Sequence, residues 1–184
     1  GYLRGWTYEK SCPELLEDFT EPGFAGDWFR KLPPKEDPTF RWIYIGPGGS
    51  RTPLHVDPCL THAWLAQIRG HKRFVLYPPS DLKYLVHPSG GAPVDPRKPD
   101  LERYPLFPAA RPIEVLLAPG DLLLVPAGWA HLVECVSDSI SLTHNFLPKH
   151  NFAAVRACLL ANRLGRAVLS QGRGQERAAE RGAE

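Results

Sequence analysis

The chain has 184 residues, of which 43% are hydrophobic and 23% charged, and its formal net charge is +2. These values predict one globular domain with a buried core and exclude a disordered protein. They do not indicate a nucleic-acid partner, and because no apolar run reaches the length of a membrane span we expect no membrane partner either.

The two ends of the sequence and its cysteines bear on where the protein works. The chain begins with Gly1, contains no Met and shows no signal peptide. Its four cysteines form no C-x-x-C pair, which favours reduced thiols over a zinc framework. We therefore expect a piece of a longer intracellular protein, nuclear or cytoplasmic.

Residues 1–39 are mixed in character and interrupted by Pro, and we expect them to flank the core as an N-terminal segment. Within this segment a short helix is predicted over 13–19, which has an acidic residue in its first turn. Aromatic and β-branched residues then predict a strand over 40–46, and the Pro47–Ser50 turn ends it.

Many short strands predict a mainly β fold over residues 40–148, as a jelly roll (double-stranded β-helix). A type II turn is predicted at Pro119-Gly120, since Gly takes the positive φ that this turn requires. The Pro- and Gly-rich stretch 78–112 is a long loop that we expect to shape a substrate groove. The further strands are expected at 53–57, 63–69, 72–77, 113–118, 121–126, 131–136 and 139–146.

The character of the sequence changes after Pro148. Apolar side chains at helical spacing predict a C-terminal helix within 149–171. This helix either packs on the barrel or forms a homodimer contact. The Arg-, Glu- and Ala-rich tail 172–184 is expected to be disordered. The apolar positions are Phe152, Val155, Leu159, Leu160, Leu164 and Val168.

Three side chains form the candidate metal site. Because side chains alternate along a strand, His55 and Asp57 point to the same face, although this pair alone also fits a surface His and a turn-capping Asp. A Gly turn before the strand 131–136 places His131 at the start of that strand. The alternative interpretation of His131 is a hydrogen-bonded His in the core. Two His and one carboxylate make a facial triad with open coordination positions, whereas a structural zinc site needs four protein ligands.

A polar strand face and a lysine are the second candidate feature. Alternation puts Ser141, Thr143 and Asn145 on one face, which lines either a wet ligand cavity or the outside of the sheet. Lys72 heads an apolar strand, where it is either a solvated strand end or the partner of a ligand carboxylate. The other His residues have no spacing that suggests a metal site, and these are His62, His71, His87, His144 and His150.

These segments together resemble the Jumonji-C (cupin-like) oxygenases over roughly residues 1–165. The resemblance rests on ordered motifs, and Leu65 departs from it where several members have Asn. The stretch around Trp64 looks most like the arginine-demethylase/lysyl-hydroxylase branch, and 94–108 looks more like the asparaginyl-hydroxylase and tRNA-hydroxylase branches. The motifs are Gly46–Ser50, Thr52–Pro58, Trp64–Arg73, Tyr77–Pro79, Val94-Asp95, Pro99–Glu102, Pro119–Asp121, Val125–Trp129 with His131, and Thr143–Phe146.

The resemblance implies a jelly roll that uses Fe(II), 2-oxoglutarate and dioxygen. It places iron on the His55, Asp57 and His131 triad. It implies that the distal carboxylate of 2-oxoglutarate binds Lys72 and Thr143, with Thr52 and Asn145 nearby.

The implied reaction is hydroxylation of a protein side chain (Lys, Arg or Asn). The alternatives are N-methyl demethylation of histone or arginine by the same chemistry, hydroxylation of an RNA base, a non-catalytic cupin scaffold, and a cupin that uses Zn or Mn. The near-neutral charge argues against RNA, and the intact triad argues against a scaffold.

Overall fold

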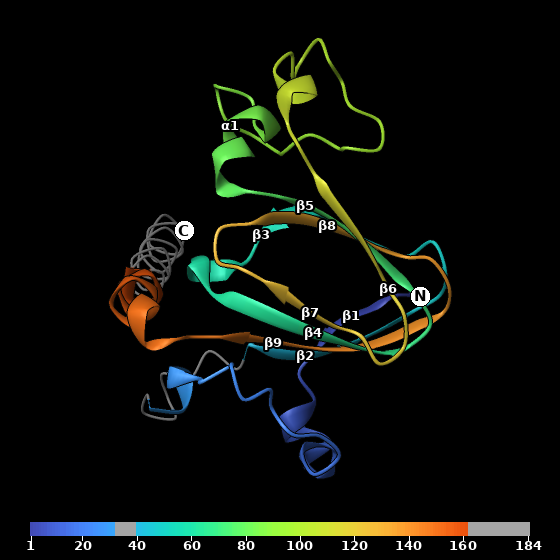
Figure 1. The fold of residues 1–184 in the computed structure, drawn as a ribbon, viewed down its shortest axis with the longest axis vertical. Helices are drawn as coiled ribbons and strands as arrows, with labels where there is room; N and C mark the ends of the chain where they lie inside the picture. The colour runs from blue at the N-terminus through green and yellow to red at the C-terminus, as the bar shows by residue number, and fades with distance from the viewer. Residues whose placement is uncertain (32–39, 162–184) are drawn as a thin grey trace, which may run out of the picture.

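A computed structural model describes residues 1–31 and 40–161. Two antiparallel sheets face each other in it as a jelly roll (Figure 1), which confirms the predicted fold class. The five-stranded sheet runs in the order β1 (Leu3–Trp6), β2 (Arg41–Gly46), β9 (Ser139–Phe146), β4 (His62–Arg69) and β7 (Leu122–Val125). The four-stranded sheet runs β3 (Arg51–Val56), β8 (Ala130–Cys135), β5 (Lys72–Tyr77) and β6 (Ile113–Leu117).

The strands match the predicted ones within two residues at each end, with one addition. Strand β1 was not predicted; it pairs with β2 and extends the larger sheet. The predicted type II turn lies between β6 and β7, where Gly120 has φ +94° and the Asp121 amide donates to the Ala118 carbonyl at 3.0 Å. The four-residue turn 118–121 thus joins the two sheets at this point.

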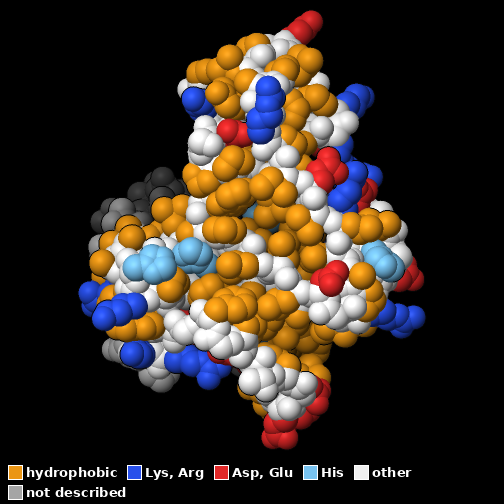
Figure 2. All heavy atoms as spheres, viewed as in Figure 1, with side chains coloured by type: hydrophobic (Ala, Val, Ile, Leu, Met, Phe, Trp, Pro, Cys, Tyr) orange, Lys and Arg blue, Asp and Glu red, His pale blue; other side chains and the backbone are white. Residues whose placement is uncertain are grey.

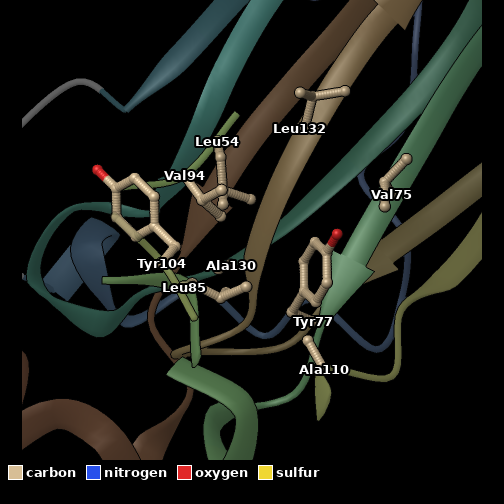
Figure 3. Close-up of a cluster of buried hydrophobic side chains, with 9 residues drawn as sticks. All are labelled: Leu54, Val75, Tyr77, Leu85, Val94, Tyr104, Ala110, Ala130 and Leu132. Carbon is tan, nitrogen blue, oxygen red and sulfur yellow. The ribbon is translucent and has the colours of Figure 1, made fainter. Parts of the chain in front are cut away.

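The segment 78–112 covers the outer face of the four-stranded sheet (Figure 1). It contains η6 (Pro79–Asp81), α1 (Leu82–Leu85) and η7 (Phe107–Ala109). Its buried side chains form one cluster with outward-facing residues of β3, β5 and β8 (Figure 3). Burying this face stabilises the sheet, so the segment has a packing role, and its part in shaping a substrate groove stays a prediction. The cluster comprises Leu54, Val75, Tyr77, Leu85, Val94, Tyr104, Ala110, Ala130 and Leu132.

The N-terminal segment covers the outer face of the five-stranded sheet in the same way (Figure 1). It contains η1 (Tyr8–Lys10), η2 (Pro13–Leu16) and η3 (Trp28–Lys31). The helix predicted over 13–19 is only a short 3₁₀ turn over Pro13–Leu16, none of whose residues is fully buried. The cluster beneath the segment includes Tyr8, Ala25, Trp64, Leu142 and Phe146.

The C-terminal segment packs on the body of the protein. After η8 (Lys149–Asn151) residues 152–161 are helical, and Val155 is buried against Phe29 and Leu147. The rest of the predicted helix and the tail lie outside the described residues, and the dimer contact stays a prediction. Among residues 1–31 and 40–161, no helix is long and apolar enough to cross a bilayer.

A buried polar pair ties the N-terminal segment to β9. The hydroxyl of Tyr8 lies 2.8 Å from Nε2 of His144, and Glu21 approaches the other ring nitrogen at 3.6 Å. His144 is 3% exposed, and burial lowers its pKa to about 3, helped by the positive charges of Arg41 and Arg30. His144 is therefore neutral in the folded protein at neutral pH.

We expect the free energy of unfolding to fall as the pH drops from the ordinary His pKa of 6.5 toward 3. In this range the unfolded chain binds a proton at His144 that the folded chain does not bind, so acid favours unfolding. Between pH 7 and pH 5 the cost is about 2 kcal/mol. Urea unfolding of the wild type and of His144→Gln at both pH values measures it. The variant should lose about this much pH dependence, and equal pH dependence in the two proteins would contradict the role of His144.

Candidate metal centre and its cavity

Strands β3 and β8 bring the predicted metal triad together. His55 and His131 are cross-strand partners, their ring centroids are 4.2 Å apart, and Asp57 follows the end of β3 directly. One ligand atom from each of the three residues lies within 4.8 Å of the others. Two imidazoles and one carboxylate therefore converge on one point, as a shared metal ion requires.

A β-bulge puts Thr52 and His55 on the same face of β3. Strict alternation would place residues three apart on opposite faces. Between the pairs Thr52–Val133 and His55–His131 the register shifts, so three steps along β3 match two along β8. The bulge contains Pro53 and Leu54, and it sends Leu54 into the outer cluster while His55 turns inward.

Each imidazole is oriented by a backbone carbonyl two residues earlier. Nδ1 of His55 donates to the Pro53 oxygen at 2.8 Å, and Nδ1 of His131 donates to the Trp129 oxygen at 3.2 Å. Because a carbonyl oxygen only accepts, the proton is on Nδ1 and the Nε2 lone pair is left for a metal. Burial lowers the pKa of His131 to about 4, with a contribution from His55, so this ring is neutral as metal binding requires.

The turn before β8 has the glycine that its geometry demands. Gly128 has φ +79°, and the Trp129 amide donates to the Pro126 carbonyl at 3.2 Å. A residue with a side chain is strained at this φ. The predicted Gly turn that delivers His131 is thus present.

The triad faces a cavity between the two sheets, with about 480 Å³ of empty space including its open mouth. On the face of the molecule shown in Figure 2, hydrophobic side chains predominate over the middle and charged ones lie toward the edges. The cavity itself has apolar and polar walls, which suits an organic ligand with a few anchoring groups. It is lined by Tyr2, Trp42, Tyr44, Thr52, His55, Asp57, Ala63, Leu65, Lys72, Phe74, Val125, His131, Val133, Thr143 and Asn145.

Lys72 is a buried cation on this cavity, not a solvated strand end. It is 1% exposed, and its Nζ donates to the Ser141 hydroxyl at 2.5 Å. Burial lowers its pKa to about 8. No carboxylate of the described residues forms an ion pair with it, so a buried positive charge faces the cavity without an opposite charge. A buried unpaired charge is costly unless a ligand compensates it.

The polar face of β9 points inward, which decides the question that its sequence pattern left open. Thr143 and Asn145 line the cavity, and Ser141 is fully buried beside Lys72. The Thr143 hydroxyl is buried and has no hydrogen-bond partner among the described residues. Thr52 lies on the opposite sheet, where its hydroxyl is 3.4 Å from that of Tyr2. All four residues predicted to hold 2-oxoglutarate thus lie on one cavity.

Sequence reasoning missed the aromatic wall formed by Tyr2, Trp42 and Tyr44. The strand 40–46 alternates, and β2 pairs Trp42 with Thr143 and Tyr44 with Ser141. Cross-strand partners share a face, so knowledge of this pairing would have placed both rings in the cavity. Tyr2 precedes β1 and gave no comparable signal. Leu65, where the chain departs from the family pattern, also lines the cavity, and it is the cross-strand partner of Thr143 on the adjacent strand.

The donor set fits Fe(II). His, His and carboxylate on one side of an ion is the arrangement of non-haem iron oxygenases, and it leaves coordination positions open. Oδ2 of Asp57 is buried without a hydrogen-bond partner among the described residues, as expected of an atom whose partner is a metal. Among the described residues, the group of ligating side chains that lies close enough together to hold a metal ion is this predicted triad.

Comparison with known proteins agrees with this geometry. Residues 2–152 match the cupin-like domain family. The chain is 38% identical over 158 residues to the lysine-specific demethylase JMJ21 of Arabidopsis thaliana, and 32% over 168 residues to the 2-oxoglutarate and iron-dependent oxygenase JMJD4 of Gallus gallus. It is 35% identical over 157 residues to the bifunctional arginine demethylase and lysyl-hydroxylase psr-1 of Caenorhabditis elegans.

These three alignments cover 80%, 89% and 79% of this chain but 17%, 39% and 39% of the relatives. The chain thus spans less than half the length of the curated relatives that it matches. The jelly roll, the triad and the match over residues 2–152 agree, and the chain belongs to the cupin-like (Jumonji-C) family.

Proposed function

We propose that this chain is the oxygenase domain of an Fe(II)- and 2-oxoglutarate-dependent dioxygenase that hydroxylates a protein side chain. The observation that carries the proposal is one cavity that holds both the His55, Asp57 and His131 triad and the buried cation of Lys72. The triad suits iron, and the cation suits a dicarboxylate. A non-catalytic scaffold would need neither a group of metal ligands nor a buried lysine cation in its cavity.

Lys72 and Thr143 are the residues that we expect to hold the distal carboxylate of 2-oxoglutarate. The ammonium and the unpartnered hydroxyl reach the same cavity from the two facing sheets, and both can donate hydrogen bonds. A carboxylate there would pair the buried charge through charge-assisted bonds, which fix orientation as well as affinity. Thr52 and Asn145 line the cavity beside it.

Bound iron would supply the oxidative chemistry, in which decarboxylation of 2-oxoglutarate to succinate is coupled to oxygen insertion into a substrate C–H bond. The residues of this chain supply position and environment. His55, Asp57 and His131 would hold the ion, and Lys72 would hold the distal carboxylate of the co-substrate in the same cavity. The aromatic wall of Trp42 and Tyr44 keeps water away from the reacting groups.

The substrate class rests on the relatives. They are named as lysine and arginine demethylases and as a lysyl-hydroxylase. We therefore propose Lys or Arg side chains in a protein as targets of hydroxylation, and we keep Asn as a target because residues 94–108 resemble the asparaginyl-hydroxylase branch. N-methyl demethylation is the second candidate, because oxygen insertion into an N-methyl group uses the same residues and releases formaldehyde.

Turnover assays on a panel of substrates test the proposal. We expect succinate from 2-oxoglutarate with iron, dioxygen and one class of Lys-, Arg- or Asn-containing peptide, with no formaldehyde. Formaldehyde in proportion to succinate from methylated peptides would establish demethylation instead. Turnover with RNA alone would assign the substrate to nucleic acid. A folded, iron-loaded protein that consumes no 2-oxoglutarate with any of them would contradict the proposal.

A further inference from the structure

We infer that Asn145 and Thr61 are positioning residues for the metal ligand Asp57, through a hydrogen-bond chain that fixes the turn after it. The inference rests on the proposed function to the extent that a metal ion binds at the triad. It gives Asn145 a role other than direct contact with the co-substrate.

The chain of contacts runs from β9 to the residue after Asp57. Nδ2 of Asn145 donates to the Thr61 hydroxyl at 2.8 Å, and this hydroxyl donates to the Pro58 carbonyl at 2.9 Å. The Thr61 amide donates to the same carbonyl at 3.2 Å. Asn145 is 2% exposed and Thr61 is fully buried, so these bonds are shielded from water. They connect the inner face of the five-stranded sheet with the end of β3.

The turn that they hold is strained. The 3₁₀ turn η5 (Pro58–Leu60) contains two consecutive non-Gly residues with positive φ, Cys59 at 53° and Leu60 at 54°. Residues with side chains adopt this conformation at an energetic cost, and they keep it only where surrounding contacts impose it. Leu60 is 55% exposed, so its own burial does not impose it. The contacts through Pro58 and Thr61 hold its two ends. Between them, Cys59 packs against the cluster of Phe29, Leu147 and Val155, and the Leu60 carbonyl accepts a bond from Nδ2 of Asn151 at 3.4 Å.

Asp57 differs from the other two ligands in how it is oriented. His55 and His131 are each held by a bond from Nδ1 to a backbone carbonyl. For the Asp57 carboxylate, no hydrogen bond is found among the described residues, and its Oδ2 is buried without a partner. Metal-bound carboxylates usually receive such bonds from neighbouring groups. Here the backbone of the next residue is held instead, so the direction of the carboxylate depends on the turn.

Mn(II) binding to the metal-free protein tests the inference without turnover. Thr61→Val keeps the shape of the side chain and removes the hydroxyl, Thr61→Ser is its matched control, and Asn145→Ala removes the donor. We expect Thr61→Val and Asn145→Ala to raise the Kd for Mn(II) about tenfold or more, the scale of groups that orient metal ligands. Thr61→Ser should stay within about twofold of the wild type, since it keeps both bonds. Near-UV circular dichroism verifies that each variant is folded.

The affinity for 2-oxoglutarate at saturating Mn(II) separates positioning from direct contact. We expect it to be unchanged in Thr61→Val, because Thr61 is not among the residues that line the cavity. If Asn145→Ala weakens 2-oxoglutarate and leaves Mn(II) unaffected, Asn145 contacts the co-substrate and the inference is overturned. It is also overturned if both folded variants bind Mn(II) as the wild type does, and Asn145→Ala decides alone if Thr61→Val does not fold. A wild type that binds no Mn(II) would instead remove the proposed function.

Discussion

Asp57→Ala should abolish 2-oxoglutarate turnover and leave the protein folded. The variant keeps both imidazoles, but it loses the carboxylate that completes the triad. A metal centre supplies several kcal/mol of stabilisation in the transition state, and losing it lowers the rate about 10³-fold or more. The fold should persist because no hydrogen bond to the Asp57 carboxylate is found among the described residues, so its removal leaves no buried donor unsatisfied.

Metal binding, urea unfolding and succinate release from the same preparations measure these effects together. Asp18→Ala is the matched control, since Asp18 is an exposed carboxylate of the N-terminal segment outside the cavity. It should retain full turnover. If Asp57→Ala stays folded and still makes succinate at the wild-type rate, the triad is wrong. An unfolded Asp57→Ala would instead show that this carboxylate supports the structure.

The parts of the fold that sequence could predict are those in which the local pattern and the packing agree. Strands β5 and β9 were predicted with their observed ends, because apolar or β-branched residues fill them and turns bound them. Strand β1 is four residues long, contains Gly5 at φ +76° and is half exposed. Its stability comes from pairing with β2, about forty residues away, and no local signal encodes that pairing.

The site divides in the same way. The His55 and Asp57 pair and the Gly turn before His131 follow from local geometry, so their convergence could be predicted. Lys72 is buried where its ammonium meets Ser141 on the facing sheet, and the sequence does not show that contact. The sequence therefore left open whether Lys72 is a solvated strand end or the partner of a ligand carboxylate. The Thr61 contact with Asn145 spans 84 residues of chain and leaves no pattern in either segment. The pairing between distant strands decided these features, whereas the metal ligands could be predicted from strand alternation and from the Gly turn before His131.

Lys72→Met should weaken 2-oxoglutarate far more than it weakens the metal. Truncating one partner of a buried charge pair costs about 2–5 kcal/mol, which corresponds to at least about a 30-fold rise in Kd. Met has a similar length and no charge, so the cavity wall stays filled. Stability without ligand should not fall, because the lysine charge is desolvated and no ion pair to a described carboxylate is present. Ser141→Ala is the matched control, since it removes one hydrogen bond and keeps the cation.

The pH dependence gives an independent measure of the same charge. Because burial lowers the pKa of Lys72 to about 8, the free protein loses this positive charge as the pH rises above 8. A carboxylate binds the charged form, so wild-type affinity for 2-oxoglutarate should be level below pH 8 and fall about tenfold per pH unit above it. Calorimetric titration at saturating Mn(II), at pH 7 and pH 9, measures both effects. In Lys72→Met the affinity should be low at both pH values and nearly equal. A variant that binds as tightly as the wild type at pH 7 would show that the co-substrate carboxylate lies elsewhere.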